Sequence, residues 1–207
     1  MDIVFPTINI HTLLIMAHVL GTAFGLGGAT VSDLLFFRAT KDGRFEAKEW
    51  EIMKLLSRVI WLGITLAVLS GIGFLFEYAM TPEKVALLEN DKIWAKMTIV
   101  LIIFLNGIFL HWKLFPIFES MVEGTKGKSK FPGNMTVVFT SGAISITSWY
   151  SAFIMGTWRG LNFTLTYWQF LGLYGTILAV AIAGANMVGR WHTRKLVVMG
   201  KKKNNTL

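Results

Sequence analysis

The chain has 207 residues, of which 54% are hydrophobic and only 15% are charged, and it contains no cysteine. A water-soluble domain usually carries about 25% charged residues, and the lack of cysteine excludes disulfides, iron–sulfur clusters and thiolate zinc sites. The net charge of +8 is concentrated in a few loops and the tail. This indicates the positive-inside pattern of a membrane protein rather than nucleic-acid binding.

Five long apolar runs predict an all-α fold, a polytopic membrane bundle of about five transmembrane helices. A run of roughly 20 apolar residues crosses a hydrocarbon core of about 30 Å, and within lipid it must be helical to satisfy its own backbone. We expect no cleaved signal peptide, because the first run is too long and follows no basic segment. The expected spans of this single membrane domain are 8–37, 59–76, 93–115, 135–157 and 167–188.

Basic residues alternate along the connecting segments and so predict an orientation. The segment before the first span has no Lys or Arg, and the fourth connection has only Arg159, whereas segment 39–57 and the tail 190–207 are rich in both. The amino terminus is therefore expected outside and the basic tail in the cytoplasm. We expect a multi-pass protein of a cell membrane, the bacterial cytoplasmic membrane.

The first cytoplasmic loop, 39–57, has the pattern of a short amphipathic helix. Its apolar residues would lie on the membrane surface while its charges face water. These apolar residues are Phe45, Trp50, Ile52 and Met53.

The first span carries two histidines on one face. His11 and His18 are seven positions apart, and residues at this spacing share one side of a helix. Gly21 and Gly25 continue the same face. This face could receive a flat porphyrin, with His18 as iron ligand, or it could let another helix pack closely.

Two further histidines lie beside tryptophans at the expected cytoplasmic ends of their spans: His111 next to Trp112, and His192 next to Trp191. Their matched depth makes His111 and His192 a candidate axial pair, whereas His18 lies in the outer half. An outer haem would need His18 or His11 with a methionine partner. The alternative is that His111 and His192 are interfacial residues wetted by headgroups.

Several other polar residues fall within the spans, where each is a functional candidate by default. Asp33 is expected to face water or to pair with Arg58, and Lys96 to extend outward or to pair with Glu77. The hydroxyl-rich fourth span indicates either helix packing or one wall of a polar cavity. The residues on its shared face are Ser141, Ser145 and Ser148.

Three short motifs resemble two families of small polytopic membrane proteins. They are His18-Val19-Leu20-Gly21 followed by Gly27-Gly28, the stretch from Arg58 to Ser70-Gly71, and Trp94-Ala95-Lys96 leading to His111 and Pro116. Together, over roughly the first 118 residues, they are similar to the CopD copper-resistance family and the HemJ-type haem-pathway proteins. The resemblance implies haem or copper handling, with His18 and His111 as metal ligands.

These observations predict a b-type haem-binding membrane protein that transfers electrons or supports a redox complex, with haem b as its cofactor. One alternative is a transporter for a metal or small solute, and another is a non-catalytic accessory subunit of a larger complex. The expected partners are the lipid bilayer and either a redox membrane partner or a second copy of the chain. Whether the protein is an enzyme is left open.

Overall fold

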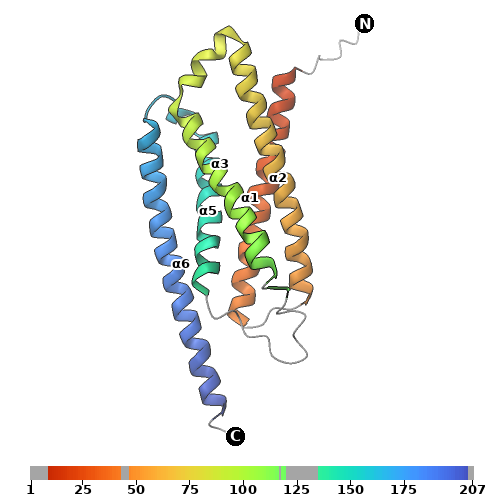
Figure 1. Ribbon diagram of the computed structural model, residues 1–207, viewed down its shortest axis with the longest axis vertical. Coiled ribbons are helices and arrows are strands. Elements are labelled where there is room, and N and C mark those ends of the chain that lie inside the picture. The colour runs from red at the N-terminus through yellow and green to blue at the C-terminus, as the bar shows by residue number, and fades with distance from the viewer. Residues whose placement is uncertain (1–8, 43–46, 117, 120–134, 205–207) are drawn as a thin grey trace.

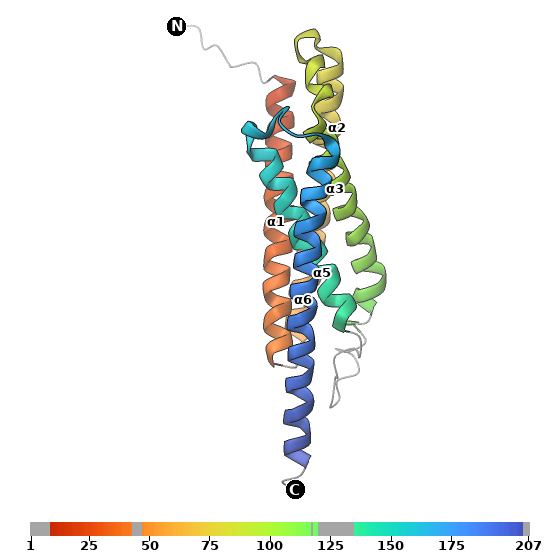
Figure 2. The ribbon, with the colours of Figure 1, turned by 90° about the vertical axis from the view of Figure 1, so that its left-hand side faces the viewer.

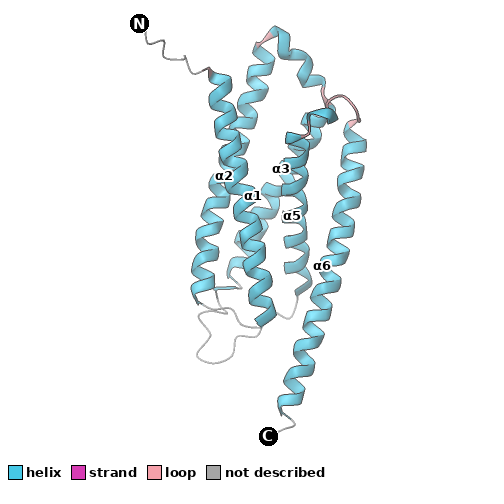
Figure 3. Cartoon of the chain, turned by 180° about the vertical axis from the view of Figure 1, so that it is seen from behind, coloured by secondary structure: helices cyan, strands magenta, loops and turns pink. Residues whose placement is uncertain are grey.

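The structure, a computed structural model, describes residues 9–42, 47–116, 118–119 and 135–204 (Figure 1). All regular elements in these ranges are helical, which confirms the predicted all-α class (Figure 3). The long helices are α1 (Ile10–Asp42), α2 (Ala47–Met80), α3 (Asp91–Phe109), α5 (Met135–Thr157) and α6 (Tyr167–Asn204). Three short helices join or extend them: η1 (Pro82–Glu89), η2 (Leu110–Leu114) and η3 (Arg159–Leu161).

Five helices are long and apolar enough to cross a membrane, which confirms the predicted number of candidate spans. Within α2 no charged side chain occurs between Arg58 and Glu77, which leaves a run long enough for a hydrocarbon core. The helices extend beyond the spans expected from the sequence, most of all α2 at its start and α6 at its end. The candidate spans in the structure are Ile10–Arg38, Ala47–Met80, Asp91–Leu114, Thr136–Thr157 and Tyr167–Trp191.

The expected amphipathic surface helix at 39–57 is wrong. α1 continues to Asp42 and α2 begins at Ala47, so most of this segment belongs to the two long helices, and Phe45 lies outside the described residues. Trp50 and Met53 are buried in a cluster with Leu114 of η2, with Phe118, and with Val138 of α5. Their apolar pattern is explained by packing between helices rather than by contact with a membrane surface.

The helices run up and down between two ends of an elongated bundle. α1 and α2 lie side by side, α5 packs against α1 and α3, and α6 packs on α5 (Figures 1 and 2). The backbones of α2 and α3 lie farther apart, and these two helices meet through side chains such as Trp61 and Phe104. We call the end where α1 begins the amino end, and the end toward which α6 extends the carboxyl end.

A single register relates α1 to the antiparallel α2. His11 meets Glu77 and His18 meets Ser70, while Gly21 lies against Ala67 and Gly25 against Gly63. The two residue numbers in each of these pairs add up to 88. A Cβ added at Gly63 would lie only 2.8 Å from the Gly21 carbonyl oxygen, so glycine is required where the two backbones approach.

The two connections at the amino end are bound to each other. The buried side chain of Asn90 accepts hydrogen bonds from the backbone N–H groups of Lys92 and Phe163, at 3.2 and 3.3 Å. Lys92 Nζ donates to the Trp158 carbonyl oxygen at 3.1 Å. These bonds fix the start of α3 against the segment between α5 and α6.

Buried residues form three clusters along the bundle. One of them lies in the middle, where α1, α2, α3 and α5 meet, and it contains Trp149. Another joins α3, α5 and α6 near the amino end, and a third lies at the carboxyl end. Their central residues are Ile64 and Ile103 in the middle, Ile99 and Phe170 near the amino end, and Trp50 and Leu114 at the carboxyl end.

Candidate functional site

A cavity lies in the carboxyl half of the bundle between α1, α2, α3 and α5. It contains about 870 Å³ of space free of atoms, part of which is open to the exterior. Toward the carboxyl end the cavity is bounded by the buried cluster around Trp50, and toward the amino end by Trp149 and Ile64. The polar side chains in its wall are Ser32, Asp33, Ser57, Asn106, His111 and Ser145.

Asp33 is the charged group of this cavity. Its Oδ2 atom is buried and has no hydrogen-bond partner among the described residues. The expected pairing with Arg58 is therefore wrong, since no described cation forms an ion pair with this carboxylate. On the facing helix α5, a Cβ added at Gly142 would lie 3.8 Å from Asp33 Oδ1, so glycine leaves room beside the carboxylate.

Asn106 and Ser141 form a reciprocal pair that joins α3 to α5 at the cavity wall. Asn106 Nδ2 donates to the Ser141 carbonyl oxygen at 3.1 Å, and Ser141 Oγ donates to Asn106 Oδ1 at 2.8 Å. On the same face of α5, Ser148 Oγ lies 2.8 Å from the Tyr174 hydroxyl of α6, and Ser145 lines the cavity. Both interpretations of the hydroxyl-rich face are thus confirmed, because it packs helices and forms a polar wall.

His111 lies in η2, one turn of π-helix that follows α3. Such turns are rare and occur frequently at functional sites. The imidazole is exposed, lines the cavity and lies 5.3 Å from the Phe115 ring, measured between centroids. A second titratable side chain therefore borders the space that Asp33 faces.

Aromatic rings form much of the remaining wall. Trp61 of α2 meets Phe104 of α3 edge to face at 5.7 Å between centroids, and both Trp61 and Trp149 line the cavity. An aromatic face attracts a cation through its quadrupole, more strongly where water is excluded. A carboxylate without a partner, framed by aromatic rings, hydroxyls and an amide, is suited to hold a small cation.

The amino half of the bundle contains the histidines predicted in the first span. His18 Nδ1 lies 2.9 Å from Ser70 Oγ, while that hydroxyl also lies 2.6 Å from the Leu66 carbonyl oxygen. The hydroxyl has one proton to donate. If it goes to the Leu66 carbonyl, His18 donates from Nδ1 and keeps the Nε2 lone pair available.

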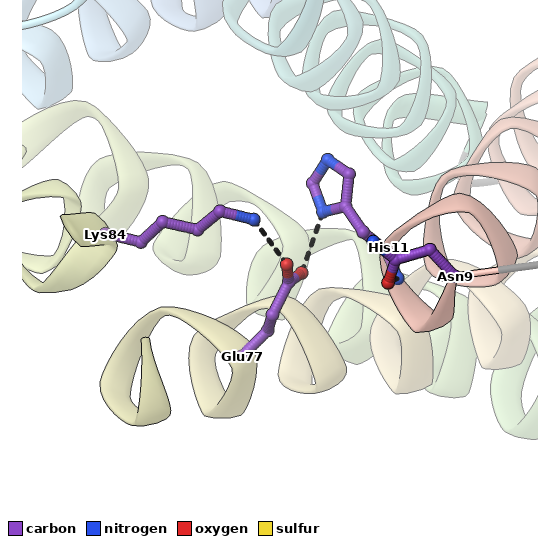
Figure 4. A network of polar contacts seen from close by, with 4 residues as sticks. All are labelled: Asn9, His11, Glu77 and Lys84. Atoms are coloured by element: carbon purple, nitrogen blue, oxygen red, sulfur yellow. Dashed lines mark hydrogen bonds and ion pairs between the residues drawn. The ribbon is translucent and has the colours of Figure 1, made fainter. Parts of the chain in front are cut away.

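His11 belongs to a second polar network, nearer the amino end (Figure 4). His11 Nδ1 lies 2.8 Å from Glu77 Oε2, and Lys84 Nζ lies 2.5 Å from Glu77 Oε1. The expected pairing of Glu77 with Lys96 is wrong, because Glu77 is occupied by a histidine of α1 and a lysine of η1. The two networks meet at Phe74, whose ring contacts both imidazoles edge to face.

The glycine face of α1 is filled by protein. A Cβ added at Gly21 would lie 2.6 Å from the Ala67 nitrogen of α2, and one at Gly25 would clash with the Trp149 ring. In this arrangement the face does not fit a porphyrin beside Gly21 and Gly25. Close helix packing, the alternative use of these glycines, accounts for them.

The predicted metal ligands His18 and His111 are far apart. His18 interacts electrostatically with Lys96, which lies 15 positions before His111 on α3 and η2 (96 to 111). That separation is about 22 Å at ~1.5 Å per residue, so these histidines do not share one iron. The side chain of His192 lies outside the described residues, and its pairing with His111 stays a prediction. The described residues contain no cluster of three or more metal-ligating side chains.

Sequence reasoning missed the residues that bind the two histidines. Ser70 was noted only within a motif and Glu77 only as a partner for Lys96, whereas Ser70 meets His18 and Glu77 meets His11. One signal was available: the spacing of seven between His11 and His18 is repeated between Ser70 and Glu77. In two antiparallel helices this equal spacing is what lets both pairs form in one register.

We compared the chain with protein-family models, curated protein sequences and solved structures, and none of the three comparisons finds a match. The resemblance to the CopD and HemJ-type families therefore stays a prediction.

Proposed function

We propose that this protein is a membrane transporter for a small cation, which binds at Asp33 in the cavity of the carboxyl half. The observation that carries the proposal is the buried Asp33 oxygen without a partner. Ionisable side chains inside a membrane protein are costly and commonly mark substrate or ion pathways. A bound cation would supply the partner of opposite charge that the Asp33 carboxylate lacks.

The aromatic and polar wall favours an organic ammonium ion over a bare metal ion. Metal ions are held by several strongly coordinating side chains, and the described residues contain no cluster of three or more His, Asp or Glu. The cavity wall has one carboxylate, and aromatic rings such as Trp61 and Trp149 lie in the same wall. An ammonium group gains from one carboxylate, from hydroxyls such as Ser145, and from aromatic faces. Methylammonium is therefore the probe of choice.

The packing of the helices is consistent with alternating access. The α1–α2 pair is held together by its glycine contacts, while α3 packs with α5 and α6. The two groups meet where α1 packs on α5 and through side chains such as Trp61 and Phe104. Rocking of such groups around a fixed site is a common transport mechanism. With the carboxyl end in the cytoplasm, as the basic segments predict, the cavity would face inward.

Uptake of radiolabelled methylammonium into proteoliposomes tests this proposal. We expect uptake above that of protein-free liposomes, and a reduction of at least about tenfold in Asp33→Asn, equivalent to ~1.4 kcal/mol of lost interaction. Glu51→Gln, at an exposed position on α2, is the matched control and should transport normally. Equal uptake by wild type and Asp33→Asn, or no uptake by wild type, would overturn the proposal.

A haem protein with His18 as ligand is the second candidate. The observation that favours it is the His18–Ser70 hydrogen bond, since metal-ligating histidines usually have their other nitrogen held by a hydrogen-bond partner. A reduced-minus-oxidised visible spectrum separates the two candidates. A sharp haem band that is lost in His18→Ala would favour this candidate, and a colourless protein after expression with added haem would exclude it.

A further inference from the structure

α3 begins with two lysines on the side that faces the bundle. Lys92 is only 7% exposed although it lies in the first turn, and Lys96 follows one turn later, beside the buried residues Ala95 and Ile99. Side chains at this spacing lie next to each other on a helix, and the two ammonium groups interact electrostatically.

The two lysines have no anionic partner among the described residues. Lys92 Nζ is bound to the Trp158 carbonyl oxygen, and Lys96 forms no hydrogen bond or ion pair there. The nearest acid on the facing helix α2, Glu77, is already paired with His11 and Lys84. Asp91 and Glu89 lie beside the start of α3 and form no ion pair with either lysine.

His18 of α1 lies at the same level of the bundle as Lys96. Gly25, seven positions after His18, meets Trp149. Trp149 packs in one cluster with Ile103, seven positions after Lys96. The His18 ring is fixed by the Ser70 bond and by an edge-to-face contact with Phe74 at 5.8 Å between centroids. The buried Lys92 and the half-buried Lys96 place positive charge without a compensating acid in the bundle, which is unfavourable in a low-dielectric environment. A complementary anion would remove this cost.

We propose that Lys96, Lys92 and His18 form a binding site for an anionic group, a carboxylate or a phosphate, in the amino half of the bundle. Lysine ammonium groups bind such oxyanions as point charges. His18 would donate to the anion from Nε2 in the tautomer whose Nδ1 accepts from Ser70 Oγ. The site lies in the opposite half from Asp33 and does not depend on transport. The anion could be a free ion or the headgroup of a lipid.

Thermal unfolding of the full-length protein in a non-ionic detergent tests this inference. Inorganic phosphate and acetate are titrated at constant ionic strength, and unfolding is followed by tryptophan fluorescence. We expect saturating phosphate or acetate to raise the Tm of wild type by about 5 °C, and to leave Lys96→Met unchanged. Lys113→Met, an exposed lysine at the other end of the same span, should respond as wild type does.

A second measurement separates the two sources of the anion and guards against a folding defect. If a lipid headgroup is the ligand, phosphatidylglycerol in nanodiscs should raise the Tm of wild type but not of Lys96→Met, while free phosphate has little effect. Without any anion, Lys96→Met should be at least as stable as wild type, because it removes a buried charge.

Three outcomes would overturn the inference. They are equal responses of wild type and Lys96→Met, no response of wild type to phosphate, acetate or phosphatidylglycerol, and a large destabilisation of anion-free Lys96→Met.

Discussion

Asn106 and Ser141 satisfy each other's hydrogen-bonding groups at the wall of the cavity, and this pairing determines whether either residue can bind a ligand. Asn106 is 8% exposed and Ser141 is 2% exposed, so each would be an unsatisfied polar group without its partner. Their bonds hold α3 against α5 at the level of Asp33. The pair is therefore a structural support of the cavity rather than a group free to bind a ligand.

Asn106→Ala is expected to destabilise the protein by about 1 kcal/mol, the usual scale for a hydrogen bond between membrane helices. The loss should appear as a lower Tm in detergent. Asn186→Ala is the matched control, because Asn186 bonds only to the Thr140 side chain on a less buried surface, and it should cost less. An equal or larger loss in the control, which joins α5 to α6, would contradict the expectation that the more buried Asn106–Ser141 pair contributes more to stability.

Residue types alone indicated which polar side chains matter but not what each of them contacts. The sequence places Asp33, Lys96 and the histidines inside spans, and membrane energetics explains why each is notable. Their partners depend on the rotation and register of the facing helices. For this reason the pairings Asp33–Arg58 and Lys96–Glu77, each one of two expected alternatives, were wrong, although Asp33 and Lys96 lie within predicted spans and Arg58 and Glu77 directly flank one.

At the scale of elements, the contact of α1 with α2 depends on glycines that let the two backbones approach. Gly63 lies against Gly21 and Gly25 of α1. Gly71, two turns farther along the same helix, has no atom within 4 Å of an added Cβ. The two glycines of one helix thus provide a substitution and its control.

Gly63→Ala is expected to cost about 1–3 kcal/mol, because the new methyl group overlaps the backbone of α1 and forces the helices apart. Gly71→Ala should be neutral or stabilise the protein by up to ~1 kcal/mol, since alanine favours the helix. The Tm of each variant in detergent checks this pair of expectations. Similar values for the two variants would contradict the close approach of α1 and α2 at Gly63.

The lengths of the elements were only partly predictable. The apolar core of each span follows from the thickness of a bilayer, and these cores agree with the structure. A helix continues past its apolar core wherever the next turns find partners, as Trp50 does against Phe118. An apolar residue that packs on a neighbouring helix has the same local pattern as one that lies on a membrane surface, so segment 39–57 was misinterpreted.

At the scale of the whole molecule, the polar side chains divide into two groups separated by a packed middle layer. The amino half contains His18 and Lys96 with their neighbours, and the carboxyl half contains Asp33 and His111. Ile64, Ile103 and Trp149 fill the space between them. No continuous polar path joins the two groups among the described residues, so transport would require the helices to move.

The five apolar helices and the alternating basic segments together predict on which side each connection lies. The chain has no cysteine, so single cysteines can be introduced without background labelling of native thiols. With five spans and the amino terminus outside, Glu83→Cys in η1 and Arg159→Cys in η3 should react with an impermeant maleimide on intact cells. Lys48→Cys in α2 and Arg190→Cys in α6 should react only after permeabilisation. The reverse pattern would invert the orientation and place the Asp33 cavity outside, and labelling of all four positions from one side would refute a five-span topology.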